Sequence, residues 1–329
     1  GPLSDRFGRR IITLFSIMIF IIASLGCFFS TKFEFFIFFR LLQASIAAGF
    51  LMSRVIIRDI TSENEAASMI GYVTMGMSII PLFAPGLGGL IQMLLGWPSI
   101  FLIMSLLGLL LLLLVFRDLG ETKIIKKNKN TKSSASFINL FWEAKFWGYS
   151  FTLAFSAGTF FSFLGGAPYV ATKVYNLNSV VSGLVMGFPA AGYFIGNYLS
   201  GRYSKFYGID YMALRGILLV IFGMFICLVI TVFYRDTPYF FFGLCSFVGL
   251  GNGLIIPNAS VGILSVNENL SGTAGGIGNA IMIGTGAILA SLTSYYLENQ
   301  TSSSYLVFIM LLSGALSYTS LYIFVLRNK

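Results

Sequence analysis

The first ten residues, GPLSDRFGRR, place one acid and three arginines around two glycines. The chemistry open to this group is ion pairing. Asp5 can lie near a helix N-terminus and pair with a neighbouring arginine, which would lock one arrangement of a helix bundle. Glycine permits the tight turn that two helices need at such a point. The alternative is a cluster of positive charges that only marks the end of a membrane span.

A second candidate is Arg40, which lies inside an apolar run in the stretch FFRLLQASIAAGF. An arginine near the middle of a membrane costs about 2.5–3.5 kcal/mol on insertion scales, so it usually has a partner or faces a water-filled cavity. The alternative is that Arg40, roughly six residues into the run, extends its side chain to the nearer membrane surface.

Membrane helices are the elements that must position these side chains. The chain is 57% hydrophobic and 10% charged, whereas a soluble domain is about a quarter charged. The apolar runs are continuous and too long for barrel strands, so an all-α membrane protein is expected. The ten predicted spans lie at about residues 11–30, 34–57, 67–94, 98–116, 147–171, 180–200, 211–233, 239–262, 273–296 and 305–326.

Composition excludes several classes of function. The chain has no histidine, and its three cysteines lie far apart in apolar runs. Histidine-based catalysis, zinc motifs and a disulfide framework are therefore not expected. A membrane-embedded enzyme would need clustered acids, His or Cys near the surface, and none is apparent. The sequence predicts neither an enzyme nor a metal site.

Positive charges predict the orientation. If residue 1 is cytoplasmic and the spans alternate, most of the 21 Lys and Arg fall on the cytoplasmic side, and only Lys32, Lys173 and Arg235 fall in the opposite loops. The positive-inside rule supports this arrangement, with the C-terminus also cytoplasmic. The net charge of +9 is then a topology signal facing anionic lipid, and no nucleic-acid partner is needed.

The chain divides into two related halves. We predict an N-terminal bundle at 1–116, a basic cytoplasmic linker at 117–145 and a C-terminal bundle at 146–329. The stretch Leu3–Phe7 recurs as Leu199–Tyr203, and Glu65 has a counterpart in Glu268. Four spans precede the linker and six follow it, so equivalent halves predict two further spans before residue 1.

These motifs resemble those of the major facilitator superfamily. Its loop signature, Gly-x-Leu-x-Asp-Arg-x-Gly-Arg-Arg, is matched by Gly1, Leu3, Asp5, Arg6, Gly8, Arg9 and Arg10. Its fourth-span signature, Arg-x-x-Gln-Gly, resembles Arg40 and Gln43, with Ala44 where glycine is usual. The antiporter motif of its fifth span resembles a kinked helix containing Pro81, Pro85, Gly86, Gly88 and Gly89.

Further stretches are similar to the bicyclomycin-resistance (Bcr/CflA) group of multidrug efflux proteins. They are Arg58-Asp59, Gly96–Phe101, Phe163–Val170 and Val174–Leu177. The resemblance implies a twelve-span transporter of the bacterial inner membrane, of which these residues are spans three to twelve. It also implies proton-driven export of small amphipathic drugs by a monomer, with no cofactor beyond the proton gradient. Arg40 and Gln43 would take part in proton transfer.

The resemblance also implies a binding site near the membrane midplane between two rocking bundles. Candidate substrate ligands are the aromatic residues and intramembrane asparagines expected to face inward: Phe160, Phe163, Tyr169, Tyr193, Asn197, Asn252, Asn258 and Asn279. Each could instead serve packing, a lipid-facing surface or, for the asparagines, a hydrogen bond between helices.

Proton coupling needs a carboxylate that titrates within the membrane, yet all 12 acids fall in loops or at span ends. In the resembling group a first-span acid is the usual candidate. We therefore expect that the 329 residues alone do not transport, whereas the full-length gene product does. The alternatives are a sugar or amino-acid transporter of the same superfamily and an inactive gene remnant.

Overall fold

The computed structural model describes residues 2–122, 139–177, 179–233, 237–267, 270–298 and 302–327. All regular elements in these ranges are helices. The helices before the linker are α1 (Pro2–Phe7), α2 (Arg9–Phe29), α3 (Phe33–Gln43), α4 (Ile46–Ile60), α5 (Glu63–Leu95) and α6 (Ser99–Asp118).

The helices after the linker are α8 (Ala144–Tyr169), α9 (Ser179–Val185), α10 (Phe188–Tyr207), α11 (Ile209–Phe233), α12 (Pro238–Ser265), α13 (Ser271–Leu297) and α14 (Ser304–Leu321). Two of them end in a wider π-helical turn, α8 at Val170–Val174 and α14 at Tyr322–Leu326. The linker lysines at 123, 126, 127, 129 and 132 lie outside the described residues.

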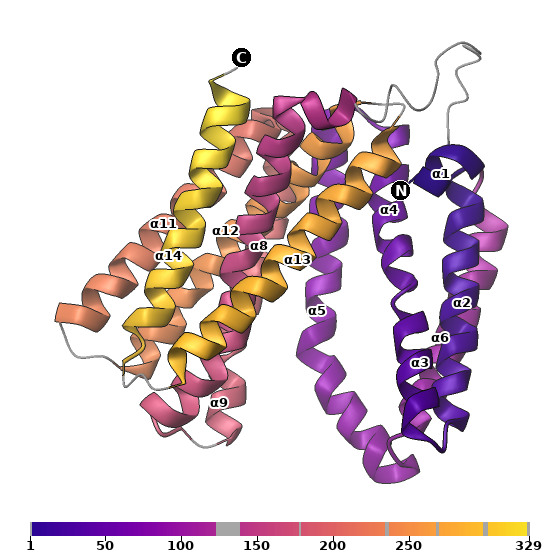
Figure 1. Ribbon diagram of the computed structural model, residues 1–329, viewed down its shortest axis with the longest axis horizontal. Coiled ribbons are helices and arrows are strands. Elements are labelled where there is room, and N and C mark those ends of the chain that lie inside the picture. The colour runs from indigo at the N-terminus through magenta and orange to yellow at the C-terminus, as the bar shows by residue number, and fades with distance from the viewer. Residues whose placement is uncertain are drawn as a thin grey trace.

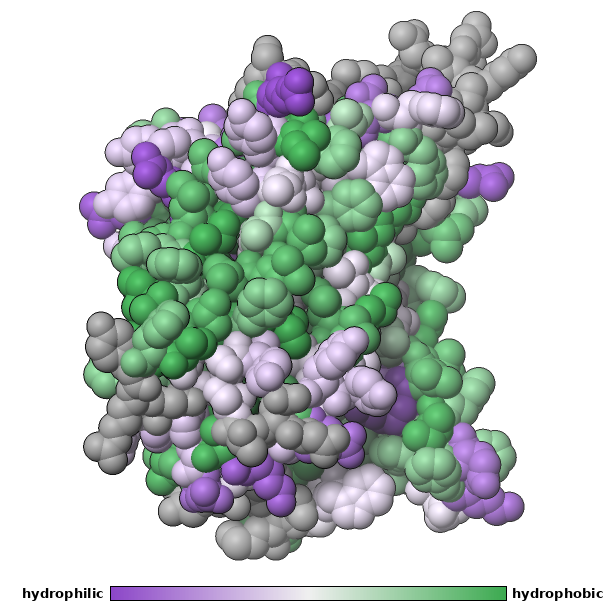
Figure 2. Space-filling view, turned by 60° about the vertical axis from the view of Figure 1, so that its left-hand side comes forward, coloured by the Kyte–Doolittle hydropathy of each residue, from purple (hydrophilic) through white to green (hydrophobic). Residues whose placement is uncertain are grey.

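Eight of these helical segments are long and apolar enough to cross a membrane. The two other predicted spans coincide with α5 and with α9 plus α10. A broad apolar band crosses the surface between two more polar ends (Figure 2). This band is where a bilayer would contact the helices.

Two groups of helices pack within themselves and meet at one end. In the first group α2 packs on α3, α4 and α6, and in the second α8, α10, α11, α12, α13 and α14 form a continuous set of contacts. The groups touch through α5 on α10 and α12, and through α1 and α4 on α13. Figure 1 shows α13 beginning beside α1 and α4 and slanting away from them. We call the end with residue 2, Arg117 and Lys145 the linker-side end.

The span predicted at 34–57 is broken in its middle, which the sequence did not reveal. Helix α3 stops at Gln43, and residues 44 and 45 form a tight turn before α4 begins. Hydrogen bonds here join residues three apart, from Ala44 N to Leu41 O and from Ser45 N to Leu42 O. The narrower turn re-aims α4 relative to α3.

The span predicted at 180–200 begins with α9 but ends too early, because the stretch 201–210, which the predicted spans leave as a turn, is helical as far as Tyr207. The helix is interrupted at residues 186 and 187, because Pro189 in the first turn of α10 cannot donate to the preceding turn. Helix α10 then continues through the predicted turn to Tyr207. The polar residues remain helical because α10 packs on α5 at this point.

Two glycines end equivalent turns in the two halves. Gly8 follows α1 with φ 99° and ψ 163°, and Gly208 follows α10 with φ 82° and ψ 163°. Such backbone angles are favourable only for glycine. The helices that contain Leu3–Phe7 and Leu199–Tyr203 thus both end at a glycine before a membrane helix, but Gly8 follows Phe7 directly, whereas Gly208 lies five residues after Tyr203.

Candidate functional site

Asp5 connects the two groups of helices at the linker-side end. Its Oδ1 atom accepts a hydrogen bond from Gly272 N at 3.0 Å, and its Oδ2 atom accepts one from Thr273 N at 2.6 Å. Thr273 Oγ1 also donates to Oδ2. Asp5 therefore caps the first turn of α13, where the helix dipole favours a negative charge.

Arg9 holds Asp5 in this position. Its side chain is only 3% exposed, and its Nη1 atom lies 2.7 Å from Asp5 Oδ1. Its Nε atom lies 3.1 Å from Asp59 Oδ2 at the end of α4, and its Nη2 atom donates to Ser271 Oγ at 2.9 Å. One buried cation thus joins two carboxylates and the start of α13. The pairing of Asp5 with a nearby arginine and a helix N-terminus is as the sequence predicted.

Glu121 fixes the turn between α1 and α2. Its carboxylate accepts hydrogen bonds from Arg9 N at 2.9 Å and Arg10 N at 3.3 Å, which satisfies the free donors at the start of α2. A Cβ atom on Gly8 would lie 2.3 Å from Glu121 Oε2. Arg10 donates to Phe116 O at 2.9 Å, whereas Arg6 is exposed. Gly1 lies outside the described residues.

A different contact joins α5 to α10. A Cβ atom on Gly71 would lie 2.6 Å from Gly201 N, and Ser68 Oγ donates to Gly201 O. One turn further along, Lys205 Nζ lies 3.1 Å from Glu65 Oε1. Hydrogen bonds from Lys205 and Ser62, together with the positive charge of Lys205, lower the pKa of Glu65 below its usual value. The counterpart predicted for Glu65, Glu268, lies outside the described residues.

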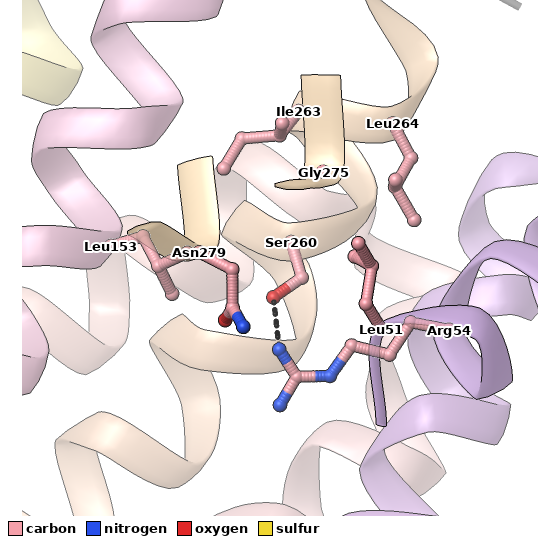
Figure 3. A pocket seen from close by; sticks show the side chains of 8 residues that line it. All are labelled: Leu51, Arg54, Leu153, Ser260, Ile263, Leu264, Gly275 and Asn279. Atoms are coloured by element: carbon pink, nitrogen blue, oxygen red, sulfur yellow. Dashed lines mark hydrogen bonds between the residues drawn. The ribbon is translucent and has the colours of Figure 1, made fainter. Parts of the chain in front are cut away.

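Two arginines of α4 reach across to α12. Arg58 Nε donates to Ser265 Oγ at 2.9 Å, and Arg54 Nη1 donates to Ser260 Oγ at 3.3 Å. Arg54 also lines a small cavity between the two groups of helices (Figure 3). Arg54 was not among the predicted site residues, and it lies within α4. Its place in the apolar run at 34–57 was the signal for its position.

These contacts share one location. Among the described residues, the hydrogen bonds and ion pairs that join the two groups of helices all lie toward the linker-side end. The chain is therefore held together at that end by charges, serine hydroxyls and a close backbone contact.

Arg40 and Gln43 form part of a separate hydrogen-bonded chain. Arg40 Nη1 donates to Gln43 Oε1 at 2.8 Å, and Gln43 Nε2 donates to Ser24 Oγ at 2.8 Å. The guanidinium lies 5.6 Å from the Phe101 ring centre. Gln43 is buried but Arg40 is exposed, and no described carboxylate pairs with Arg40. A role in proton transfer stays a prediction.

The antiporter motif lies in the second half of α5, where the helix bends (Figure 1). The side chains of Pro81 and Pro85, with Gly86 and Gly89, lie outside what the structure describes. A Cβ atom on Gly88 would meet no atom within 4 Å. The predicted contribution of these residues to packing therefore stays a prediction.

The predicted aromatic ligands occupy different environments. Phe163 is buried and packs on Phe242, with ring centres 6.2 Å apart, and on Phe160. Tyr169 donates from its hydroxyl to Glu298 O at 3.0 Å, which joins α8 to the end of α13. These contacts lie within the second group of helices.

Three of the predicted asparagines are buried within the second group of helices. Asn252 accepts from Ser156 and donates to Thr159 of α8. Asn258 donates to Ser200 of α10 at 3.0 Å, and Asn197 donates to Tyr193 O at 2.8 Å. Amide oxygens Oδ1 of Asn197 and Asn258 have no partner among the described atoms. A substrate-binding role for these side chains stays a prediction.

Tyr193 and Asn279 are the predicted ligands that meet at the interface between the groups. Asn279 lines the same cavity as Arg54, and its amide points toward the same space (Figure 3). Tyr193 of α10 lies close enough to interact electrostatically with Arg54. The sequence therefore identified two neighbours of Arg54 but not Arg54 itself.

Comparison with known proteins assigns this chain to a family. The sequence profile of the Major Facilitator Superfamily matches residues 1–291. An uncharacterized MFS-type transporter of Bacillus subtilis, YdgK, is 30% identical over 213 residues, which are 62% of this chain and 52% of YdgK. The match thus spans about half the length of that relative. A bicyclomycin resistance protein homolog of Haemophilus influenzae is 28% identical over 302 residues, 89% of this chain and 75% of the relative.

Solved structures show the same fold. A crystal structure of the Escherichia coli fucose:proton symporter FucP superposes with a TM-score of 0.78 at 12% sequence identity. The superposition covers 98% of this chain and 85% of the symporter. At this identity the likeness concerns the arrangement of helices alone.

Proposed function

The chain belongs to the major facilitator superfamily, and we propose that its full-length form exports small amphipathic drugs by proton antiport. It is a multi-pass membrane protein of a bacterial drug-transporter family and not an enzyme. The drug as substrate is supported by the relative named for bicyclomycin resistance. The proposed location is the bacterial inner membrane, with residue 1 and the C-terminus in the cytoplasm, and the proposed working unit is a monomer.

The proposed transport mechanism is supported by the hydrogen bonds and ion pairs between the two bundles, which among the described residues all lie toward the linker-side end. Helices α2–α6 and α8–α14 are bundles of a membrane transporter that, in this proposal, rock about a central pathway. The contacts of Asp5, Arg9, Arg54 and Arg58 close the linker-side end. With that end in the cytoplasm, the molecule is in an outward-facing arrangement. Opening it requires these bonds to exchange with water or substrate.

Proton coupling is assigned to the Arg40 and Gln43 pair. The chain Arg40, Gln43, Ser24 is hydrogen-bonded end to end. Protonation of a nearby carboxylate would release Arg40 and change this chain of hydrogen bonds. The 12 acids of the sequence lie in loops or at helix ends, so the proposal places the proton-carrying acid outside these residues.

The test is efflux from cells that carry the complete reading frame containing these residues. Cells should accumulate less bicyclomycin and ethidium than empty-vector cells, and a protonophore should remove the difference. Arg40→Gln should reduce efflux about tenfold or more, since a proton-transfer partner is lost. Lys32→Gln is the matched control, because Lys32 is an exposed cation just before α3. Efflux that survives the protonophore, or equal efflux by both variants, would contradict proton antiport.

A further inference from the structure

Arg54 is a charged side chain at the interface of the bundles with no described carboxylate beside it. It lies on α4, six positions before the helix ends at Ile60, which is roughly 9 Å of helix. Arg54 interacts electrostatically with Tyr193. It takes part in none of the ion pairs among the described residues. A cation at this depth is costly unless something offsets its charge.

Arg58 offers a direct comparison one helical turn away. It makes the same kind of bond to α12, donating from Nε to Ser265 Oγ. Unlike Arg54, it lies within electrostatic reach of a carboxylate, Asp59. The position of Arg58 is therefore explained by its part in holding the interface closed. The charge of Arg54 is not offset in this way, because its hydrogen-bond partner across the interface is a single serine hydroxyl.

The groups around Arg54 suit a ligand with one anionic group on an apolar body. Its guanidinium extends across the interface from α4 toward α12 (Figure 3). Asn279 of α13 adds an amide to the lining of the cavity, and Tyr193 of α10, outside that lining, interacts electrostatically with Arg54. Apart from Ser260, the remaining lining side chains are apolar, namely Leu51, Leu153, Ile263 and Leu264. A planar guanidinium binds a carboxylate with two parallel hydrogen bonds, most strongly where water is scarce.

We propose that Arg54 binds a carboxylate of the transported molecule, with Asn279 and Tyr193 flanking it. The proposal rests on the function proposed above and adds aromatic or aliphatic monocarboxylates to its substrates. The residues come from both bundles, so the ligand contacts both sides of the pathway. In the present arrangement Ser260 Oγ accepts the hydrogen bond of Arg54. A carboxylate takes the place of that hydroxyl, which ties substrate binding to release of a contact that closes the linker-side end.

The test compares naphthoate with its uncharged amide, naphthamide. The two probes share one ring system and differ in charge. Binding to the purified full-length protein is measured by competition with labelled naphthoate. Naphthoate should bind about tenfold more tightly than naphthamide, because a charge-assisted bidentate pair replaces a neutral hydrogen bond. Arg54→Gln should remove this preference, and Arg54→Lys should restore part of it.

Two control variants test whether Arg54 binds a ligand or only holds the two bundles together, which we call a structural latch. Arg58→Gln removes the neighbouring contact to α12, and Ser260→Ala removes only the hydroxyl partner of Arg54. Both should keep the preference for naphthoate. Equal loss of the preference in Ser260→Ala and Arg54→Gln would make Arg54 a structural latch and overturn the proposal. Equal affinity for the two probes, or binding of neither, would also overturn it.

Efflux of ethidium, a cation, is measured with the same variants. If ethidium efflux by the parent protein persists while the carboxylate preference is absent, the inference fails and the proposed drug export stands. If the parent protein exports neither ethidium nor bicyclomycin, the proposed function itself fails.

Discussion

Two turns of related sequence close the linker-side end by different means. The first, which contains Leu3–Gly8, presents Asp5 to the start of α13 through charge-assisted hydrogen bonds. The second, which contains Leu199–Gly208, has Lys205 at the position equivalent to Asp5, three residues before the glycine that follows the helix, and Lys205 contacts Glu65 of α5. There the backbone of α10 lies against Gly71 of α5.

We interpret the Asp5 contact as a switch and the contact of Gly71 with Gly201 as a pivot. Hydrogen bonds to a carboxylate can exchange with water, so the Asp5 contact can form and break during a cycle. The contact of Gly71 with Gly201 depends on close packing, which is lost only when the helices separate. We infer that the bundles open at Asp5 and rotate about the contact between α5 and α10.

Asp5→Asn should have the largest effect on this pair of contacts. The amide lacks the negative charge that now accepts hydrogen bonds from the backbone N–H groups of Gly272 and Thr273, from the Thr273 hydroxyl and from the Arg9 guanidinium. The closed linker-side end should lose about 2 kcal/mol, within the range for hydrogen bonds to a charged group. Drug efflux should fall accordingly, and thermal unfolding should begin at a lower temperature.

Asp118→Asn is the control for this change. Asp118 is an exposed acid at the same end of the molecule, at the last residue of α6. It should leave efflux and unfolding temperature near those of the parent protein. If both variants behave alike, general charge at this end explains the effect and the Asp5 switch does not.

Gly71→Ala should have the next largest effect, because the new methyl group has no room. Its Cβ atom would lie 2.6 Å from the backbone nitrogen of Gly201. Overpacking of this kind costs about 1–3 kcal/mol. Gly76→Ala on the same helix is the matched control, since its Cβ atom meets nothing within 4 Å. A calorimetric comparison in which the two variants unfold together would exclude the pivot.

Glu121→Gln should have a smaller effect on the switch. The amide keeps one acceptor for the start of α2 but loses the charge that favours the helix N-terminus. A loss of about 1 kcal/mol in the free energy of unfolding is expected, as for other helix caps. Chemical unfolding of parent and variant measures it. An unchanged unfolding midpoint would show that Glu121 does not support the turn.

Protonation of Glu65 should have the smallest effect. Its pKa is lowered by Lys205 and Ser62, so the contact with Lys205 contributes above the ordinary pKa and is lost as the pH falls through the lowered value. Both side chains are about half exposed, and salt screens them. Glu65→Gln should weaken closure slightly at neutral pH, in low salt only. Glu34→Gln, an exposed acid far along the chain, is the control. A salt-independent effect would be contrary to this account.

The sequence predicted the all-helical membrane fold well, because spans need long apolar runs that can be read directly. It also predicted that Asp5 lies at a helix N-terminus beside an arginine. It could not predict which helix, because Gly272 and Thr273 lie 267 and 268 residues away along the chain.

The misses have physical causes of the same kind. The predicted turn at 201–210 is helical because α5 packs on it, and packing outweighs local polarity. Arg54 was not predicted as a site residue, because Ser260 and Asn279 come beside it only in the folded chain. The partners of Asn252 and Asn258, Ser156 and Ser200, depend on tertiary contacts in the same way, and a binding role for the two asparagines stays a prediction.

The most direct test of the switch is a pair of distances measured by pulsed electron paramagnetic resonance. Spin labels at Arg117 and Tyr207 report the linker-side end, and labels at Lys32 and Lys173 report the opposite end; all four side chains are exposed. The native cysteines are buried, so labelling is directed to the introduced ones. Asp5→Asn should lengthen the first distance and shorten the second relative to the parent protein. Two unchanged distances would contradict the claim that Asp5 holds the bundles closed.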